Sequence, residues 1–357
     1  MDKAVTYLGR SVQTNAKFWA ARTLLAQVLI ARKDYAAALS EINKVLEVQK
    51  RNVFAYRVRA SIYIFQKNYE AAGTDIQEII RRKPKQAGDY GMLAMCQIEQ
   101  KKYREAIENA QKSLELDKTH SPAAFVIGMA YFKTKDFHKA VKAFDVAIRL
   151  APTIGLYFMY RGQCFRQLKQ YDLAFQDMNH AVELWPSCDS YYQRGLLYLK
   201  VNNHALGLVD FESAVQMKPD EYVPYIGRGY AHLLLDDYDT AKADFEYSLT
   251  CQENAYAYCN LSEIHLFKGE YGDAIKGYQK AIELMPELED SALGSALAHF
   301  SQGEVEKARE IWAGLVKDEP RFQEVGWVVE EYGQHPKMAA LIRRFFAEGQ
   351  ITNPPTA

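Results

Sequence analysis

The chain has 357 residues, of which 48% are hydrophobic and 25% are charged, and its 44 basic side chains nearly balance its 45 acidic ones. This composition is typical of a soluble globular protein, and it provides neither the broad basic field of a nucleic-acid-binding protein nor a polyacidic tail. No apolar run approaches the roughly 18 residues of a membrane span, and the start of the chain lacks the apolar core of a signal peptide, so we expect no direct membrane insertion.

A short side chain, Ala or Gly, recurs every 33 or 34 residues within a similar local pattern. We call these positions the anchors: Ala4, Ala38, Ala72, Ala106, Ala140, Ala174, Gly207, Ala241, Ala274 and Ala308. A period of this length indicates stacked repeats, each of which packs only on its neighbours. Such a chain can exceed the roughly 250–300 residues at which a single core stops growing.

Residues 1–16 form the first predicted element. Ala4, Leu8 and Ser11 match the second helix of a repeat whose first helix is missing. Two explanations stay open. The pattern favours a chain cut from a longer protein, and the alternative is a natural N-terminal cap.

Residues 17–320 are predicted to hold nine repeats, each a pair of amphipathic helices, because apolar residues recur at spacings of three and four on both sides of a polar turn. In the unit around Ala140 the turn runs from Lys133 to Asp136, and Pro152 ends the second helix. A small residue twelve before each anchor lets the two helices approach closely. These residues are Ala26, Ala60, Ala94, Gly128, Gly162, Gly195, Gly229, Ser262 and Ala296.

The order of small, aromatic, small and bulky residues followed by proline resembles the tetratricopeptide repeat family. Tyr35 and Phe137 show the aromatic residue three before an anchor, and Phe144 shows the bulky residue four after one. The resemblance implies an all-α fold, a right-handed α-solenoid (superhelix) of helix–turn–helix repeats of 33–34 residues. It also implies that the first helix of each repeat lines a concave groove.

The C-terminal elements depart from the repeat. Residues 321–348 are predicted to form capping helices, in which Leu341, Ile342 and Phe345 cover the last repeat while Arg343 and Arg344 face solvent. Residues 349–357 are predicted to form a disordered tail.

The predicted partner site lies on one face of the first helices, at positions fifteen, eleven and eight before the anchors. The middle of the chain is unusually apolar there and predicts an exposed stripe that contacts a helix or an extended peptide. The candidate partner-binding residues are Phe125, Met129, Phe132, Met159, Gln163, Arg166, Tyr192, Leu196, Ile226 and Tyr230. The alternative is that many of them pack adjacent first helices together.

Other kinds of site find no support in the sequence. The Lys and Asn pattern with which this family clamps chaperone C-termini is absent, since Arg57 is the only cation at the corresponding places. His232, His265 and His299 recur one repeat apart, too far for one zinc ion, and are expected to fill a tyrosine slot. We find no phosphate loop and no catalytic constellation, so we expect no cofactor, no metal and no enzymatic activity.

The five cysteines, Cys96, Cys164, Cys188, Cys251 and Cys259, follow no disulfide or zinc spacing. Buried thiols are expected at Cys96 and Cys164, which lie in first helices. This pattern favours a reducing compartment and hence a cytoplasmic location, although an upstream targeting segment could be missing from this chain.

Three functional hypotheses follow. The leading one is a non-enzymatic scaffold that binds a peptide or protein segment in the concave groove. The second is a regulatory or substrate-selecting arm of a longer enzyme or of a membrane-associated assembly complex. The third is self-assembly into a homo-oligomer through the unpaired face of residues 1–16.

Overall fold

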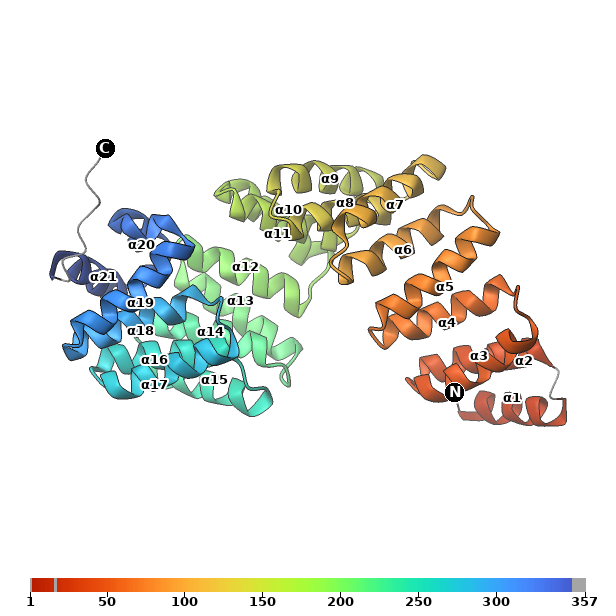
Figure 1. The fold of residues 1–357 in the computed structure, drawn as a ribbon, viewed down its shortest axis with the longest axis horizontal. Coiled ribbons are helices and arrows are strands. Elements are labelled where there is room, and N and C mark those ends of the chain that lie inside the picture. Colours follow the sequence, from red (N-terminus) through yellow and green to blue (C-terminus); the bar gives the residue numbers. More distant parts are fainter. Residues whose placement is uncertain (1, 16–17, 349–357) are drawn as a thin grey trace. The chain divides into compact units, whose positions relative to one another are not determined.

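The computed structural model describes residues 2–15 and 18–348, which fold into α-helices and one short 3-10 helix (Figure 1). The all-α prediction is confirmed, because helices pack in consecutive pairs in chain order, as in an α-solenoid. The chain divides into two compact units, 1–184 and 185–357, and each is described by itself. Among the described residues, no helix is long and apolar enough to cross a membrane.

The first unit holds eleven of the described helices. They are α1 (Asp2–Thr14), α2 (Trp19–Ala31), α3 (Tyr35–Val48), α4 (Val53–Phe65), α5 (Tyr69–Arg82), α6 (Ala87–Glu99), α7 (Tyr103–Leu116), α8 (Ser121–Lys133), α9 (Phe137–Leu150), α10 (Gly155–Gln167) and α11 (Tyr171–Leu184). The first helices of its repeats are the even-numbered ones, and α1 packs on α2.

The second unit contains the remaining repeats and the C-terminal helices. They are α12 (Cys188–Lys200), α13 (His204–Met217), α14 (Tyr222–Leu234), α15 (Tyr238–Cys251), α16 (Ala255–Lys268), α17 (Tyr271–Leu284), α18 (Glu289–Gln302), α19 (Val305–Asp318), η1 (Pro320–Gln323), α20 (Val325–Tyr332) and α21 (Pro336–Glu348). Here too the even-numbered helices from α12 to α18 are the first helices of their repeats.

The turn inside each repeat reverses the chain through one residue in the left-handed backbone region, five before the anchor. Seven of these residues are not glycine: Lys33, Lys67, Lys101, Lys135, Lys169, Asn202 and Asp236. The last two repeats use Gly269 and Gly303. The residue after the left-handed one precedes the second helix directly, and in several repeats it is Asp or Asn. Asp136 is an example: its side chain accepts a hydrogen bond from the backbone N–H of Lys139 in the first turn of α9.

Small residues let the helices of a repeat touch. The anchors from Ala38 to Ala308 are all buried, and so are the small residues twelve positions before them. At Gly128 a Cβ atom would lie 2.4 Å from the ring of Phe144, which packs directly against the glycine. The spacing of small residues therefore predicts the closest helix contacts correctly.

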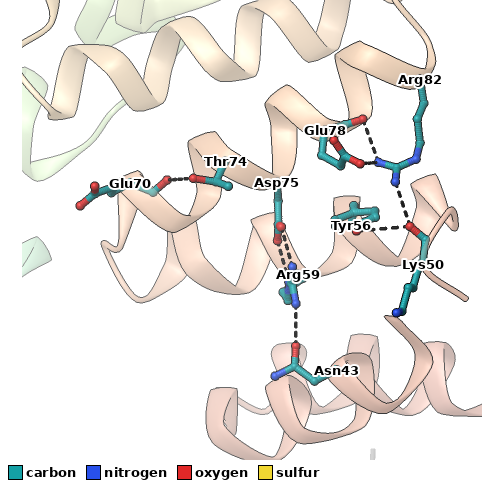
Figure 2. Close-up of polar contacts among 9 residues, drawn as sticks. All are labelled: Asn43, Lys50, Tyr56, Arg59, Glu70, Thr74, Asp75, Glu78 and Arg82. Carbon is teal, nitrogen blue, oxygen red and sulfur yellow. Dashed lines mark hydrogen bonds and ion pairs between the residues drawn. The ribbon is translucent and has the colours of Figure 1, made fainter. Parts of the chain in front are cut away.

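A buried ion pair, which the sequence analysis missed, joins the two helices of four repeats. Arg59 donates to both carboxylate oxygens of Asp75 at 2.8 and 2.7 Å and to the side-chain oxygen of Asn43 in the preceding repeat at 2.9 Å (Figure 2). The same pairing, sixteen residues apart, recurs at Arg161–Asp177, Arg194–Asp210 and Arg228–Asp244. The aspartates are almost fully buried, so each arginine neutralises a carboxylate that water does not reach.

The C-terminal helices cover the last repeat. Ile342 and Phe345 are fully buried, Leu341 is half-buried, and Arg343 and Arg344 are exposed. The ring of Phe345 lies 5.1 Å from that of Phe300 in α18 and 4.7 Å from that of Trp312 in α19. The predicted tail, residues 349–357, lies outside the described residues.

Candidate functional site

The ten predicted partner-binding residues fall in both units. Six lie on α8 and α10 of the first unit, and four lie on α12 and α14 of the second unit. A stripe that continues across the boundary between residues 184 and 185 stays a prediction. Within each unit, the structure shows which of these side chains a partner can reach.

In the first unit, much of the predicted stripe is buried. Phe125, Met129 and Met159 are only 5–7% exposed, and Gln163 is also buried. The ring of Phe125 stacks on that of Tyr157 at 5.0 Å and packs on Phe144 at 5.7 Å. The expectation that these side chains are exposed is therefore wrong, because neighbouring first helices lie close enough for their aromatic rings to bury one another. Phe132 and Arg166 are half-buried, and partner binding by this set stays a prediction.

In the second unit, the four predicted residues line a pocket of about 390 Å³ together with residues that were not predicted. Ile226 is buried, whereas Tyr192, Leu196 and Tyr230 are half-buried. The pocket lies on the first helices of four successive repeats, α12, α14, α16 and α18. Its other lining residues are Gly227, Tyr256, Cys259, Asn260, Glu263, Tyr278, Leu288, Asp290, Leu293, Tyr332, Gln334 and Met338.

One wall of the pocket is the C-terminal segment, residues 331–338, which contains the end of α20, the connection to α21 and the start of α21. It returns across helices that lie up to 131 residues earlier in the chain. Glu331 accepts a hydrogen bond from Lys200 of α12 at 3.2 Å, and the Tyr230 hydroxyl of α14 lies 3.4 Å from the side-chain oxygen of Gln334. Tyr332 donates to Glu289 at the start of α18. Residues 321–348 were predicted to cap the last repeat, and no pattern in the sequence indicates these contacts.

The segment is also held at its C-terminal end. His335 is 2% exposed, and its ring lies 4.5 Å from that of Phe267 in α16. Lys337 donates to the Tyr238 hydroxyl at 2.7 Å, and its ammonium lies 3.6 Å from the carboxylate of Asp236. These contacts fix residues 331–338 against α14 to α16, so the pocket is a built feature of the second unit.

Two carboxyl groups give the pocket its electrostatic character. Glu263 of α16 is 9% exposed, and Asp290 stands in the first turn of α18. Burial raises the pKa of Glu263 to about 8, with the nearby charge of Asp290 as the second cause. No basic side chain is among the residues that line the pocket in the described part of the chain.

One feature of the sequence distinguishes Glu263. This residue occupies the position eleven before the anchor, where the other repeats carry no acidic residue. Their residues are Gln27, Ser61, Met95, Met129, Gln163, Leu196, Tyr230 and Leu297. Tyr256 and Asp290 share a different position, eighteen before their anchors, which the groove prediction did not include.

The three periodic histidines serve the turns. Nδ1 of His232, His265 and His299 lies 3.2, 2.5 and 2.7 Å from the carboxylate five residues later. Each of these acidic residues stands directly before the second helix of its repeat. Among the described residues, no group of three His, Cys, Asp or Glu side chains is placed to hold a metal ion.

Sequence models of the tetratricopeptide repeat match three stretches of the chain, residues 92–153, 189–221 and 255–288. Each stretch covers helix pairs whose packing is described above. The matches therefore fall in both units.

Similar curated proteins cover part of the chain. Human tetratricopeptide repeat protein 12 is 25% identical over 107 residues, which is 30% of this chain and 15% of that protein. Human Superkiller complex protein 3 is 26% identical over 112 residues, which is 31% of this chain and 7% of that protein. The matching part of the chain thus spans less than a sixth of either relative.

Two solved structures share the fold over a longer stretch. The crystal structure of the APC/C hetero-tetramer Cut9-Hcn1 aligns with a TM-score of 0.60 at 18% identity, covering 83% of this chain and 59% of that chain. A tetratricopeptide repeat protein from Parabacteroides merdae aligns with a TM-score of 0.56 at 19% identity, covering 69% of this chain and 98% of that chain.

The fold, the repeat pattern and these comparisons agree. Tetratricopeptide repeats generally act as non-enzymatic scaffolds for interactions between proteins, and no feature of the described residues indicates catalysis. The chain belongs to the tetratricopeptide repeat family.

Proposed function

We propose that the second unit binds a segment of a partner protein along the first helices α12 to α18, beside its own C-terminal segment. The observation that carries this proposal is the pocket of about 390 Å³, because it collects all four predicted residues of this unit on four successive repeats. Pockets of this kind and size, about 300–1,000 Å³ and rich in aromatic side chains, commonly bind ligands.

Further support comes from the chemistry of the lining. Tyrosine side chains provide large rigid surfaces with a polar end, and they are enriched in the residues that dominate binding energy at protein interfaces. Tyr256 is 47% exposed at the edge of the pocket. Two of the similar proteins carry the names of protein complexes, which agrees with a scaffold that binds other proteins.

The proposal is tested by selecting a random 16-residue peptide display library on the full-length chain and measuring the affinity of the enriched peptides. Tyr256→Ala is expected to weaken these peptides about tenfold or more, because it removes an exposed aromatic contact without opening the core. Tyr7→Ala on α1 is the matched control, since Tyr7 is also exposed and lies in the other unit.

Failure to enrich any peptide, or equal affinity for wild type and Tyr256→Ala, would contradict the proposal. Equal affinity would instead favour binding at the predicted residues of the first unit, on α8 and α10.

A further inference from the structure

The second unit holds two acidic groups that have no cationic partner. Among the described residues, the side chains of Glu263 and Asp290 form no ion pair and no hydrogen bond with another side chain, although both line the pocket. Lys200 lies close enough to influence Asp290, but its ammonium pairs with Glu331 at 3.2 Å. A carboxylate that is nine-tenths buried without a partner is unfavourable for the fold. Glu263 is therefore poorly explained as a structural residue.

A third polar group points to the same space. Tyr278 of α17 is 1% exposed and lines the pocket, and its hydroxyl has no hydrogen-bond partner among the described residues. Gly294 of α18 makes room for it, because a Cβ atom there would lie 2.2 Å from Cζ of Tyr278 and 2.6 Å from the hydroxyl oxygen. Buried hydroxyl groups normally have a partner. A ligand that donates hydrogen bonds would supply one.

Aromatic rings complete the lining. Tyr192, Tyr230, Tyr256, Tyr278 and Tyr332 come from four helices and the C-terminal segment. The faces of aromatic rings attract ammonium and guanidinium groups, and this attraction strengthens when water is excluded. The same rings pack well on the methylene stem of a long basic side chain.

We propose that this pocket binds the side chain of a Lys or Arg residue of the partner segment, with its cationic end between Glu263 and Asp290. The tyrosine rings surround the stem, and the Tyr278 hydroxyl accepts a hydrogen bond from the cation. This inference rests on the proposed function, since it names the residue type through which the bound segment is anchored.

The first test uses a small probe that needs no partner protein. Butylammonium reproduces the end of a lysine side chain, and 1-butanol is its neutral counterpart. Saturation-transfer NMR on the full-length chain is expected to show butylammonium bound at least tenfold more tightly than 1-butanol. Glu263→Gln and, separately, Asp290→Asn are expected to remove most of this preference. Glu246→Gln, an exposed carboxylate on α15 outside the pocket, is expected to leave it unchanged.

Circular dichroism and the melting temperature establish that each variant is folded. Asp290 is exposed at the start of its helix, so Asp290→Asn keeps the test valid if the change at Glu263 alters the fold. Equal binding of butylammonium and 1-butanol, or an unchanged preference in both variants, would overturn the inference.

The second test separates this inference from the proposed function. A peptide enriched by the display selection is synthesised with each Lys replaced by norleucine and each Arg by citrulline. At one of these peptide positions, the replacement is expected to weaken binding to the wild-type protein at least tenfold. The same replacement should change the affinity for the Glu263→Gln variant little. Enriched peptides that need no basic residue would overturn the inference and leave the proposed function standing. Butylammonium binding without any enriched peptide would assign the pocket to free amines and overturn the proposed function.

The affinity for the probe is also expected to depend on pH. Glu263 faces Asp290 of α18, Tyr230 of α14, Tyr278 of α17 and Cys259 of its own helix. Because a cation binds the ionised carboxylate, affinity for butylammonium should rise by up to about tenfold per pH unit until pH reaches the pKa of about 8, and then level off. Affinity that does not change between pH 6 and pH 8 would contradict the role of Glu263.

Discussion

Glu263 combines a buried carboxyl group with the lack of a cationic partner among the described residues. Its pKa is raised from 4.5 to about 8 by burial first and by Asp290 second. Below pH 4.5 the group is protonated in both the folded and the unfolded chain, so it costs nothing. Between pH 4.5 and pH 8 the unfolded chain releases a proton that the folded chain keeps, and the free energy of unfolding falls as the pH rises.

Replacing Glu263 with Gln should therefore stabilise the protein at pH 8. Between pH 4.5 and pH 8 the wild type loses about 1.4 kcal/mol of unfolding free energy per pH unit, or about 5 kcal/mol in total. The variant avoids this loss because the amide does not ionise. Melting curves of both proteins at pH 5 and pH 8 measure this, and the difference should grow with pH. A variant less stable than wild type at pH 8 would show that the carboxylate supports the fold.

The burial of some single residues could be predicted from the sequence, and that of others could not. The burial of Cys96 and Cys164 was predicted correctly, since both follow the small residue of a first helix. The burial of Phe125 and Met129 was not, because position on the groove face does not reveal how closely the next first helix approaches. For Glu263 the sequence contained the information, in the form of an acidic residue at a position that is otherwise uncharged.

At the scale of elements, the turn of each repeat requires a left-handed residue, and a Cβ atom at such a position costs roughly 1–2 kcal/mol. The polar residues of these turns predict where the chain reverses, but they do not identify the residue with the left-handed backbone. At Gly303 the backbone φ is +92°, and no atom lies within 4 Å of an added Cβ. This position isolates the backbone effect from packing.

Gly303→Ala is expected to destabilise the protein by roughly 1–2 kcal/mol, because only the backbone conformation resists the change. Gly314→Ala is the control with the opposite sign, since Gly314 lies inside α19, also with open space around an added Cβ. It should gain about 0.5–1 kcal/mol from helix propensity. Urea denaturation of both variants provides the measurement, and a loss at both positions would refute the explanation.

The buried Arg–Asp pairs are an element-scale feature that the sequence already contained. An arginine stands thirteen before the anchor in four repeats, and each of these repeats also has an aspartate three after the anchor, as in Arg228 and Asp244. Helical periodicity does not predict the pair, because the two residues lie on different helices and meet only when the repeat closes. The sequence indicates the pair only through the occurrence of this arginine and this aspartate in the same four repeats.

At the scale of the whole molecule, the last repeat depends on the C-terminal helices for its burial. Phe345 is fully buried against Phe300 and Trp312, and large-to-small changes at such sites cost about 3–5 kcal/mol. Stability in stacked repeats is approximately a sum of terms from units and their neighbours. Damage at the C-terminal end should therefore stay local.

Phe345→Ala is expected to reduce the hydrogen-exchange protection of α18 to α21 and to leave that of α2 to α9 unchanged. Hydrogen exchange read by mass spectrometry gives protection helix by helix. A uniform loss along the chain would instead show that the two units unfold together.

The division into units relates to a sequence feature. The first 33-residue interval shortens the connection near Pro186, and the boundary between the two units lies beside it, after Leu184. The second shortened connection, between Thr250 and Asn254, lies inside the second unit. Loss of one residue therefore does not by itself determine a boundary, since the packing of the helices on either side also contributes.

The sequence by itself determined the helix pairs, their order and the small residues at their closest contacts. These features depend on residues close together in the sequence, and the same pattern recurs along the chain, so each repeat supports the prediction for the others. Only the tertiary structure decided which groove side chains remain accessible and how residues 331–338 close the pocket. Those contacts join Gln334 to Tyr230 and Glu331 to Lys200, more than 100 residues apart. They belong to one segment outside the repeat, and a periodic pattern holds no information about where such a segment packs.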